Sequence, residues 1–438
     1  MAAYIQRLHH ISLHVSSADK ISRELVSKFK FNLFAARLQD KSRQFAFKKG
    51  RAVFVVNERP NLGKTRLNER HEPNLEDFQA GKLNRESLSA CLYDVTPHYS
   101  VDTVANVCFE VENVQRSFHT LRQLGCTFLV PPTTVRDDGG AVTYSVVKSI
   151  VGNVCHTLID KSEYEGGFLP GFKLVGDARK DEEDATCPVT HFDHVTYACP
   201  RRFTHSVMDW YEKLFGFKRF FIGSGEDPDE GFVLDQEGIG LRLTAMEYWK
   251  CSEKGLTLPS AHQREPDCKF VIAESLPEQG RNQVDQFLQQ HRGAGIQHIG
   301  LYTDDILSTA QSMSRAGVSF FCPPPAYYTE VGKQQEIVEA GHSPELLSQH
   351  GILLDTDLQD TEGTRDKTQG HERRYLLQVF TRPLFSEDTF FLELIERRGA
   401  SGFGEGNIRA LWKSVQTYME KEEKNNNKNN QTLQSAKG

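Results

Sequence analysis

The stretch RGAGIQHIGLYTDD (Arg292–Asp305) has the pattern of a glycine turn, a short strand and the start of a helix. Its centre is His298, which follows Gln297 on an otherwise apolar strand. Two other apolar stretches contain a metal-binding side chain: HFDHVTYAC contains His194, and TFFLELIERRG contains Glu393. Two histidines and one carboxylate occupy one face of an octahedral ion and leave three positions open, as in non-heme Fe(II) oxygenases. The sequence therefore predicts an iron site built from three strands.

These stretches belong to an internal repeat. Four segments open alike, and each is followed by a helical segment and then by β-rich sequence; they are LHHISLHV from Leu8, VANVCFEV from Val104, FDHVTYAC from Phe192 and IQHIGLYT from Ile296. The pattern predicts an α+β fold of four βαβββ modules paired into two domains. A helix in the segment NIRALWKSVQTYMEK, whose apolar residues share one face, is expected to close the second domain.

A chain of 438 residues is too long for one ordinary core, so two domains are expected. We predict a first domain over residues 1–175 and a catalytic second domain over residues 191–420. The charged segment GDARKDEEDATCPVT, residues 176–190, is the expected linker. Residues 421–438 are low in complexity and are expected to be disordered.

Composition excludes several classes of protein. The net charge of −7 and the lack of a basic stripe argue against nucleic-acid binding. No apolar run is long enough for a membrane span. The nine cysteines are scattered and never form a C-x-x-C pair, which indicates a reducing compartment. No secretory signal is visible, and a short mitochondrial signal overlapping the first strand stays open.

The repeat provides an internal control for the iron site. The aligned pairs are His194 with His10, His298 with Asn106, and Glu393 with Thr157. A single histidine on a strand is more often a core side chain bonded to backbone than a ligand. Here two histidines and a carboxylate stand at matching positions of the second domain, while the first domain has only one ligand. A charged Glu393 among apolar neighbours is costly to bury unpaired, and an ion would offset that cost.

Four motifs resemble the family of 4-hydroxyphenylpyruvate dioxygenase and 4-hydroxymandelate synthase, in the vicinal-oxygen-chelate superfamily. They are FDHVTYA, GAGIQHIGLYTDDI, YLLQVFTRP and FFLELIERRGASGFGEGNI. The resemblance spans most of the chain and implies two glyoxalase-like domains. It also implies that His194, His298 and Glu393 hold one Fe(II) per chain, with 4-hydroxyphenylpyruvate and O2 as substrates. It leaves a homodimer open.

The resemblance implies roles for other residues. Polar residues at positions that handle the substrate in the family are Gln283, Gln297, Gln378 and Asn407. Aromatic residues at positions that wall the substrate ring are Phe380, Phe391 and Phe403. For the glutamines, a structural amide is the alternative, although an amide within an apolar strand needs a partner.

Three positions depart from the dioxygenase pattern within the expected pocket. Leu243 stands where the dioxygenase has serine, Ser275 lies near the place of an asparagine, and Ile408 replaces a phenylalanine. The smaller Ile408 resembles the mandelate synthase and would let the substrate ring shift. The resemblance therefore implies oxidation of 4-hydroxyphenylpyruvate to 4-hydroxymandelate.

Other functions remain open at this stage. Within the same chemistry, homogentisate formation in tyrosine breakdown is the first alternative. Extradiol ring cleavage uses the same type of ligand set, but the three-glutamine pocket argues against it. A metal-stabilised binding protein without turnover belongs to a different class. The resemblance further implies a mitochondrial role in ubiquinone head-group synthesis, with a cytoplasmic location as the alternative.

Overall fold

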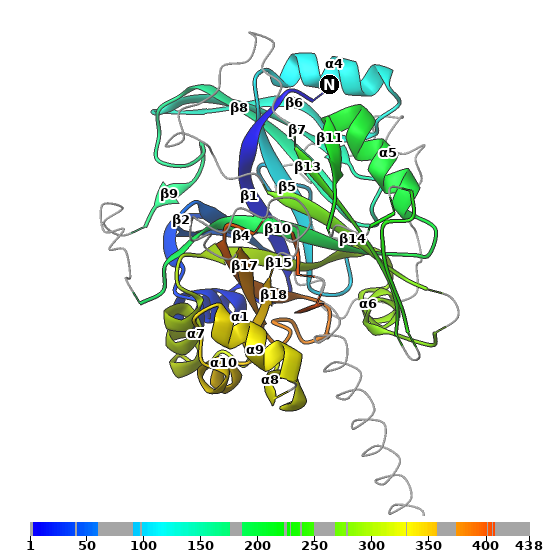
Figure 1. Ribbon diagram of the computed structural model, residues 1–438. Coiled ribbons are helices and arrows are strands. Elements are labelled where there is room, and N and C mark those ends of the chain that lie inside the picture. Colours follow the sequence, from blue (N-terminus) through cyan, green and yellow to red (C-terminus); the bar gives the residue numbers. More distant parts are fainter. Residues whose placement is uncertain are drawn as a thin grey trace, which may run out of the picture.

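The computed structural model describes residues 3–39, 42–59, 91–96, 99–175, 186–222, 226–227, 229–236, 239–248, 268–276, 279–329, 331–356, 374–400, 402–404 and 406–407. These residues form two nine-stranded mixed sheets, each curled around its own interior (Figure 1). The strands of the first sheet are β1 (Ile5–Val15), β2 (Asn32–Gln39), β3 (Ser42–Lys49), β4 (Ala52–Glu58), β5 (Thr103–Val111), β6 (Phe128–Asp137), β7 (Gly140–Lys148), β8 (Cys155–Tyr164) and β9 (Lys173–Leu174).

The second sheet has a similar plan. Its strands are β10 (Val189–Cys199), β11 (Phe217–Phe220), β12 (Phe232–Gln236), β13 (Ile239–Tyr248), β14 (Lys269–Ser275), β15 (Gly295–Thr303), β16 (Leu353–Thr356), β17 (Tyr375–Phe380) and β18 (Phe391–Arg398). The spatial orders are β6-β7-β8-β5-β1-β4-β3-β2-β9 and β11-β13-β14-β10-β15-β18-β17-β16, with β12 beside β13. In both sheets two antiparallel strands lie at the centre, β1 with β5 and β10 with β15, and each has a parallel neighbour on its other side.

The helices lie outside the curled sheets (Figure 1). They are α1 (Ala18–Arg23), the π-helix η1 (Glu24–Lys28), α4 (Val114–Gln123), α5 (Thr204–Phe215), α6 (Gln283–His291), α7 (Ile306–Arg315), α8 (Ala326–Thr329), α9 (Val331–Glu339) and α10 (Pro344–His350). Local chemistry sets their ends. The Asp305 side chain caps α7 by accepting from the backbone N–H of Ser308, and Gly216 ends α5 in the left-handed region at φ 75°.

An apolar core joins the two sheets. Phe54 of β4 packs edge-on against Phe192 of β10, with ring centroids 5.0 Å apart. Phe109 of β5 lies 6.1 Å from Phe270 of β14. These aromatic pairs belong to one buried cluster that contains residues of both sheets. Because this core is continuous, the second sheet is held in place against the first.

The α+β class and the two curled sheets are confirmed, whereas the count of four equal modules stays a prediction. The first sheet repeats the order strand, helix and three strands twice. In the second sheet β12 adds a short strand, and α8 to α10 stand between α7 and the last three strands.

The predicted domain boundaries stay predictions, because much of the linker lies outside the described residues. Strand β10 begins at Val189, inside the predicted linker, because Val189 pairs with Thr303. The predicted closing helix beyond residue 407 and the tail over 421–438 also lie outside the described residues. Among the residues that are described, no helix is long and apolar enough to cross a membrane.

Candidate metal centre

Three strands at the centre of the second sheet bring His194, His298 and Glu393 together. The Oε2 atom of Glu393 lies 3.0 Å from Nε2 of His194 and 3.6 Å from Nε2 of His298. The ligand atoms of the three residues all lie within 4.8 Å of one another. The two imidazole rings stand at 89° to each other, with centroids 5.4 Å apart. The nitrogens and the carboxylate oxygen therefore converge on one point.

The strand register explains this convergence. On β15 the pair His298 and Gly300 share a face, because side chains on a strand alternate. Gly300 lies between His194 of β10 and Glu393 of β18, to each of which it is directly paired. A Cβ atom at Gly300 would come closer than 3.0 Å to the His194 ring. Glycine at this position therefore leaves the space that the His194 imidazole fills.

A buried ion pair fixes the orientation of His194. Its Nδ1 atom donates to Oδ1 of Asp193 at 2.9 Å. Arg397 donates to both oxygens of Asp193, each at 2.8 Å. With Nδ1 engaged in this way, Nε2 of His194 points at Glu393. A carboxylate behind a histidine is the usual arrangement that sets the tautomer and ring orientation of a metal ligand.

Glu393 is held by a separate chain of hydrogen bonds. Gln378 donates from Nε2 to Oε1 of Glu393 at 2.7 Å, which leaves Oε2 facing the histidines. Asn407 donates to the amide oxygen of Gln378 at 3.0 Å. The Tyr327 hydroxyl donates to Asn407 at 2.9 Å and so links helix α8 to the site. This chain fixes the amide of Gln378 with its nitrogen toward the carboxylate.

Charge and burial oppose each other at the histidines. Burial lowers the pKa of His194, but the charge of Glu393 and the hydrogen bonds that His194 donates to Asp193 and Glu393 outweigh burial and raise it to about 9. Burial, followed by the nearby charge of His194, lowers the pKa of His298 well below its usual value. The raised pKa of His194 favours a proton on its ring in the absence of an ion, and a divalent ion would have to displace that proton.

The three side chains form part of the wall of a cavity inside the second sheet. The polar lining residues besides the ligand set are Thr196, Gln283, Gln297 and Gln378. The apolar lining residues are Ile222, Leu241, Leu243, Val271, Ala273, Phe380 and Phe403. An ion held by the two histidines and the glutamate would have its open positions on the side of this cavity. The donor set fits a divalent ion such as Fe(II), since two neutral nitrogens and one carboxylate leave room for a chelating ligand.

Comparisons with known proteins agree with this geometry. Residues 191–339 match the model of the Glyoxalase/Bleomycin resistance protein/Dioxygenase superfamily. The chain is similar to a 4-hydroxyphenylpyruvate dioxygenase-like protein of Rattus norvegicus, with 40% identity over 425 residues that cover 95% of this chain and 98% of the relative. It is 30% identical to the 4-hydroxyphenylpyruvate dioxygenase of Yarrowia lipolytica, over 73% of each chain.

The chain belongs to the 4-hydroxyphenylpyruvate dioxygenase-like family. Its fold is also similar to that of a triple mutant of 4-hydroxymandelate synthase from Streptomyces coelicolor, with a TM-score of 0.66 and 22% identity over 95% of this chain and 99% of that one. Family membership supports an oxygenase of the vicinal-oxygen-chelate superfamily.

Most of the residues matched to the family pocket lie at the cavity. Gln283, Gln297, Gln378, Leu243, Phe380 and Phe403 line it, together with the three candidate ligands. Phe391 instead stacks on the His298 ring, with centroids 4.6 Å apart at 17°. Asn407 reaches the cavity through Gln378. The roles of these residues stay predictions.

One matched residue, Ser275, lies apart from the cavity lining. Ser275 is buried, and its hydroxyl donates to Asp285 and accepts from Arg201. It does not belong to the lining of the cavity among the described residues. Its position follows from the register of β14, which pairs Ser275 with Leu241 at the end of the strand. Ile408 lies outside the described residues.

Four residues that support the candidate ligands were not predicted from the sequence: Asp193, Arg397, Gly300 and Tyr327. Asp193 stands directly before His194, and this adjacency was an available signal for a supporting carboxylate. The glycine two residues after His298 was a second signal, because a metal ligand on the next strand needs space. No local pattern marks Tyr327, which meets Asn407 across the fold.

Proposed function

We propose that this chain is an Fe(II)-dependent dioxygenase that converts 4-hydroxyphenylpyruvate and O2 to 4-hydroxymandelate and CO2. One observation carries the proposal: His194, His298 and Glu393 converge on the wall of a cavity that three glutamine side chains and two phenylalanines also line. A ligand set of this kind with open positions is typical of non-heme Fe(II) oxygenases. When bound, Fe(II) supplies a Lewis acid for the 2-oxo acid and the redox partner for O2.

The protein contributes placement and protection. Asn407 donates a hydrogen bond to Gln378, and Gln378 donates one to Glu393. These two bonds hold the Glu393 carboxylate and place the Gln378 amide at the cavity. Gln283 and Gln297 supply amides at other parts of the lining and offer hydrogen bonds to the keto acid or the phenol. Because the remaining lining is mainly apolar, water is excluded once the aryl group is bound.

The site of oxidation depends on where the aryl group lies. Phe380 and Phe403 lie on the cavity wall, and Phe403 also packs edge-on against His194 at 5.2 Å. Leu243 places an aliphatic side chain where the dioxygenase resemblance has a hydroxyl, so this wall cannot hydrogen-bond the phenol. A ring that moves away from the ion leaves the benzylic carbon in reach, and this supports 4-hydroxymandelate over homogentisate.

A cellular role follows from the same proposal. The product would serve as a precursor of the ubiquinone head group, and the protein would act in mitochondria. Targeted inactivation of the gene, with ubiquinone measured before and after addition of 4-hydroxymandelate, tests this role. Recovery of ubiquinone by the added acid supports the proposal, and unchanged ubiquinone on inactivation contradicts it.

The decisive biochemical experiment identifies the product. The purified chain is loaded with Fe(II) without oxygen and given 4-hydroxyphenylpyruvate and then O2, and the product is identified by mass and retention time. We expect 4-hydroxymandelate, and we expect Glu393→Gln to abolish its formation. Asp209→Asn is the matched control, because Asp209 is exposed and pairs only with Lys213 on α5 among the described contacts.

The other possible outcomes of this experiment distinguish the alternative functions. Homogentisate would show that the aryl group reaches the ring-oxidising position despite Leu243. Iron binding at one equivalent without turnover of any aryl 2-oxo acid would contradict the enzyme proposal and favour a binding protein.

A further inference from the structure

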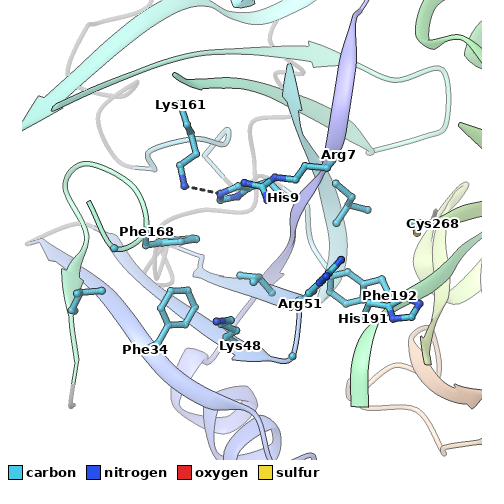
Figure 2. Close-up of a pocket in the computed structure, with 15 residues that line it drawn as sticks. Arg7, His9, Phe34, Lys48, Arg51, Lys161, Phe168, His191, Phe192 and Cys268 are labelled. Carbon is cyan, nitrogen blue, oxygen red and sulfur yellow. Dashed lines mark hydrogen bonds between the residues drawn. The ribbon is translucent and has the colours of Figure 1, made fainter. Parts of the chain in front are cut away.

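A second, larger cavity lies between the two sheets. Its volume is about 600 Å³, and its walls come from β1, β2, β3, β4, β8 and β9 of the first sheet, from β10 of the second and from residues beside these strands. Figure 2 shows Lys161, His9 and Arg7 along one side, with Lys48 and Arg51 across the opening. This cavity is separate from the candidate metal centre, because the two share no lining residue.

The lining of this cavity is strongly positive. The lining includes four cationic residues, Arg7, Lys48, Arg51 and Lys161, of which Arg7 is paired with Glu110 outside the lining. None of the lining residues that the structure describes is an aspartate or a glutamate. Composition does not explain this bias, because the whole chain has 59 acidic and 52 basic residues. Several cationic side chains on a concave surface with low-dielectric walls produce a focused positive potential, which attracts anions.

Lys161 is the most constrained of these cations. It is partly buried on β8, and its ammonium donates to Nε2 of His9 at 3.4 Å. The other nitrogen of His9, Nδ1, lies 2.8 Å from Nδ1 of His10. Burial, followed by His10 and then the charges of Lys161 and Arg7, holds the pKa of His9 well below its usual value, so this ring is neutral at pH 7. Since an ammonium has three N–H groups and His9 accepts from one, Lys161 retains donors for a ligand.

Burial is also the main factor that lowers the pKa of Lys161, and the charge of Arg7 acts in the same direction. The carboxylate of Glu110 opposes this shift, but Glu110 is itself bound by Arg7 at 2.8 Å. A second anion near Lys161 would therefore stabilise its charged form.

Aromatic and apolar side chains lie between the cations. The Phe168 ring stacks on His9 at 5.6 Å and 25°, and Phe34 meets Phe168 edge-on at 5.0 Å. Leu8, Val53 and Phe192 are further apolar members of the lining. A site that combines flat rings with separate cationic groups favours a ligand with an apolar body and an anionic end.

We propose that this cavity binds a small organic anion: an aromatic ring, or a body of similar size, that bears a phosphate or a carboxylate. The anionic group would accept hydrogen bonds from Lys161 on one wall or from Arg51 on the facing wall. The ring would lie against Phe168 and Phe34. This site is independent of the iron chemistry proposed above, so either proposal stands if the other fails.

Calorimetry with defined probes tests the site. Phenyl phosphate and phenylacetate are titrated separately into the full-length chain, with phenol as the uncharged probe of the same ring. We expect at least one anion to bind more tightly than phenol and to weaken as salt increases. Lys161→Gln and Arg51→Gln remove one cation each from the two walls and are expected to weaken binding at least about tenfold.

The controls locate the effect in the cavity. Lys213→Gln removes an exposed cation on α5 and should leave binding unchanged. Circular dichroism and thermal unfolding establish that each variant is folded, and the two variants on different walls give independent readouts. The relative affinity of the two anions distinguishes a phosphate from a carboxylate ligand. Absence of binding by both anions, equal binding by phenol, or unchanged binding in both cavity variants would overturn the proposal.

Discussion

Replacement of Asp193 by asparagine is the sharpest test of the proposed metal centre. Asp193 accepts two hydrogen bonds from Arg397 at 2.8 Å and one from His194 at 2.9 Å. Asparagine keeps the volume but removes the charge, and it leaves Arg397 buried without its close counter-ion. Breaking one side of a buried ion pair costs about 3 to 5 kcal/mol of stability. We expect a loss of this size in chemical denaturation of the metal-free chain.

The same substitution acts on iron binding by a separate route. The carboxylate holds the His194 ring with Nε2 toward the other two ligands. Loss of a carboxylate behind a metal-binding histidine costs about 10- to 100-fold in metal affinity. Anaerobic titration with Fe(II), followed by the absorbance of a competing chelator, measures this change.

A double variant separates the two effects. Adding Arg397→Met to Asp193→Asn removes the unpaired charge, and apolar replacement of a buried ion pair is often close to neutral. We therefore expect the double variant to regain much of the stability while its Fe(II) affinity stays low. Wild-type iron affinity in the single variant would refute the reasoning that Asp193 positions His194. Recovery of iron affinity together with stability would show that the single variant lost iron only through its fold.

Three further predictions follow from the geometry. Gly300→Ala should force the His194 ring out of place and lower Fe(II) affinity by on the order of 100-fold, measured by the same titration, while near wild-type affinity would contradict the packing argument. Asn407→Ala should free the amide of Gln378 and lower kcat/KM for 4-hydroxyphenylpyruvate about tenfold with iron still bound, and unchanged kinetics would exclude this positioning role. Burial lowers the pKa of His156 to about 4, so the unfolded chain binds more protons between pH 6.5 and 4 and the folded state loses stability as the pH falls. This shift corresponds to about 3 kcal/mol of unfolding free energy at pH 4. The free energy of unfolding, measured by chemical denaturation at several pH values in this range, should fall less steeply with decreasing pH for His156→Gln than for the wild type. An equal slope of unfolding free energy against pH would refute the prediction.

The three candidate metal ligands could be selected from the sequence because each lies within a short strand pattern that is visible locally. His194, His298 and Glu393 each stand on a strand with apolar neighbours, and the repeat supplies the comparison that separates them from core histidines. The strand registers reproduce that comparison: His194 pairs with Gly300, and His10 pairs with Cys108 at the corresponding place of the first sheet.

The residues that support the ligands could not be predicted in the same way. Asp193 and Arg397 are 204 positions apart, and their contact depends on the order of strands in the sheet. Tyr327 meets Asn407 only because α8 folds back onto the site. Ser275, which the resemblance assigns to the pocket, has its hydroxyl engaged by Asp285 and Arg201, and its role stays a prediction.

The positive cavity between the sheets had no signal in the sequence. Its cations come from β1, β3, the following turn and β8, and each one alone is typical of a solvated surface. Only the fold places them around one space together with Phe168 and Phe34. The function of such a site is therefore accessible from structure and not from local patterns.

The described part of the first sheet has the same strand register but lacks the candidate ligand set of the second sheet. At the place of His298 it has Asn106, whose amide donates to Asp94 at 2.8 Å and to Thr157 at 2.7 Å. Asp94 also binds His14 at 2.9 Å, so its carboxylate is already satisfied.

The cluster of His9, His10 and Cys108 is a poor substitute for the ligand set of the second sheet. Its ligand atoms lie within 4.8 Å of one another, but burial raises the pKa of Cys108 well above its usual value and keeps the thiol protonated. The nearby ammonium of Lys161 adds repulsion for a cation. Where Gly300 opens space beside His194, Cys108 fills it beside His10. Among the described residues, this cluster is therefore a weaker candidate for a divalent cation than His194, His298 and Glu393.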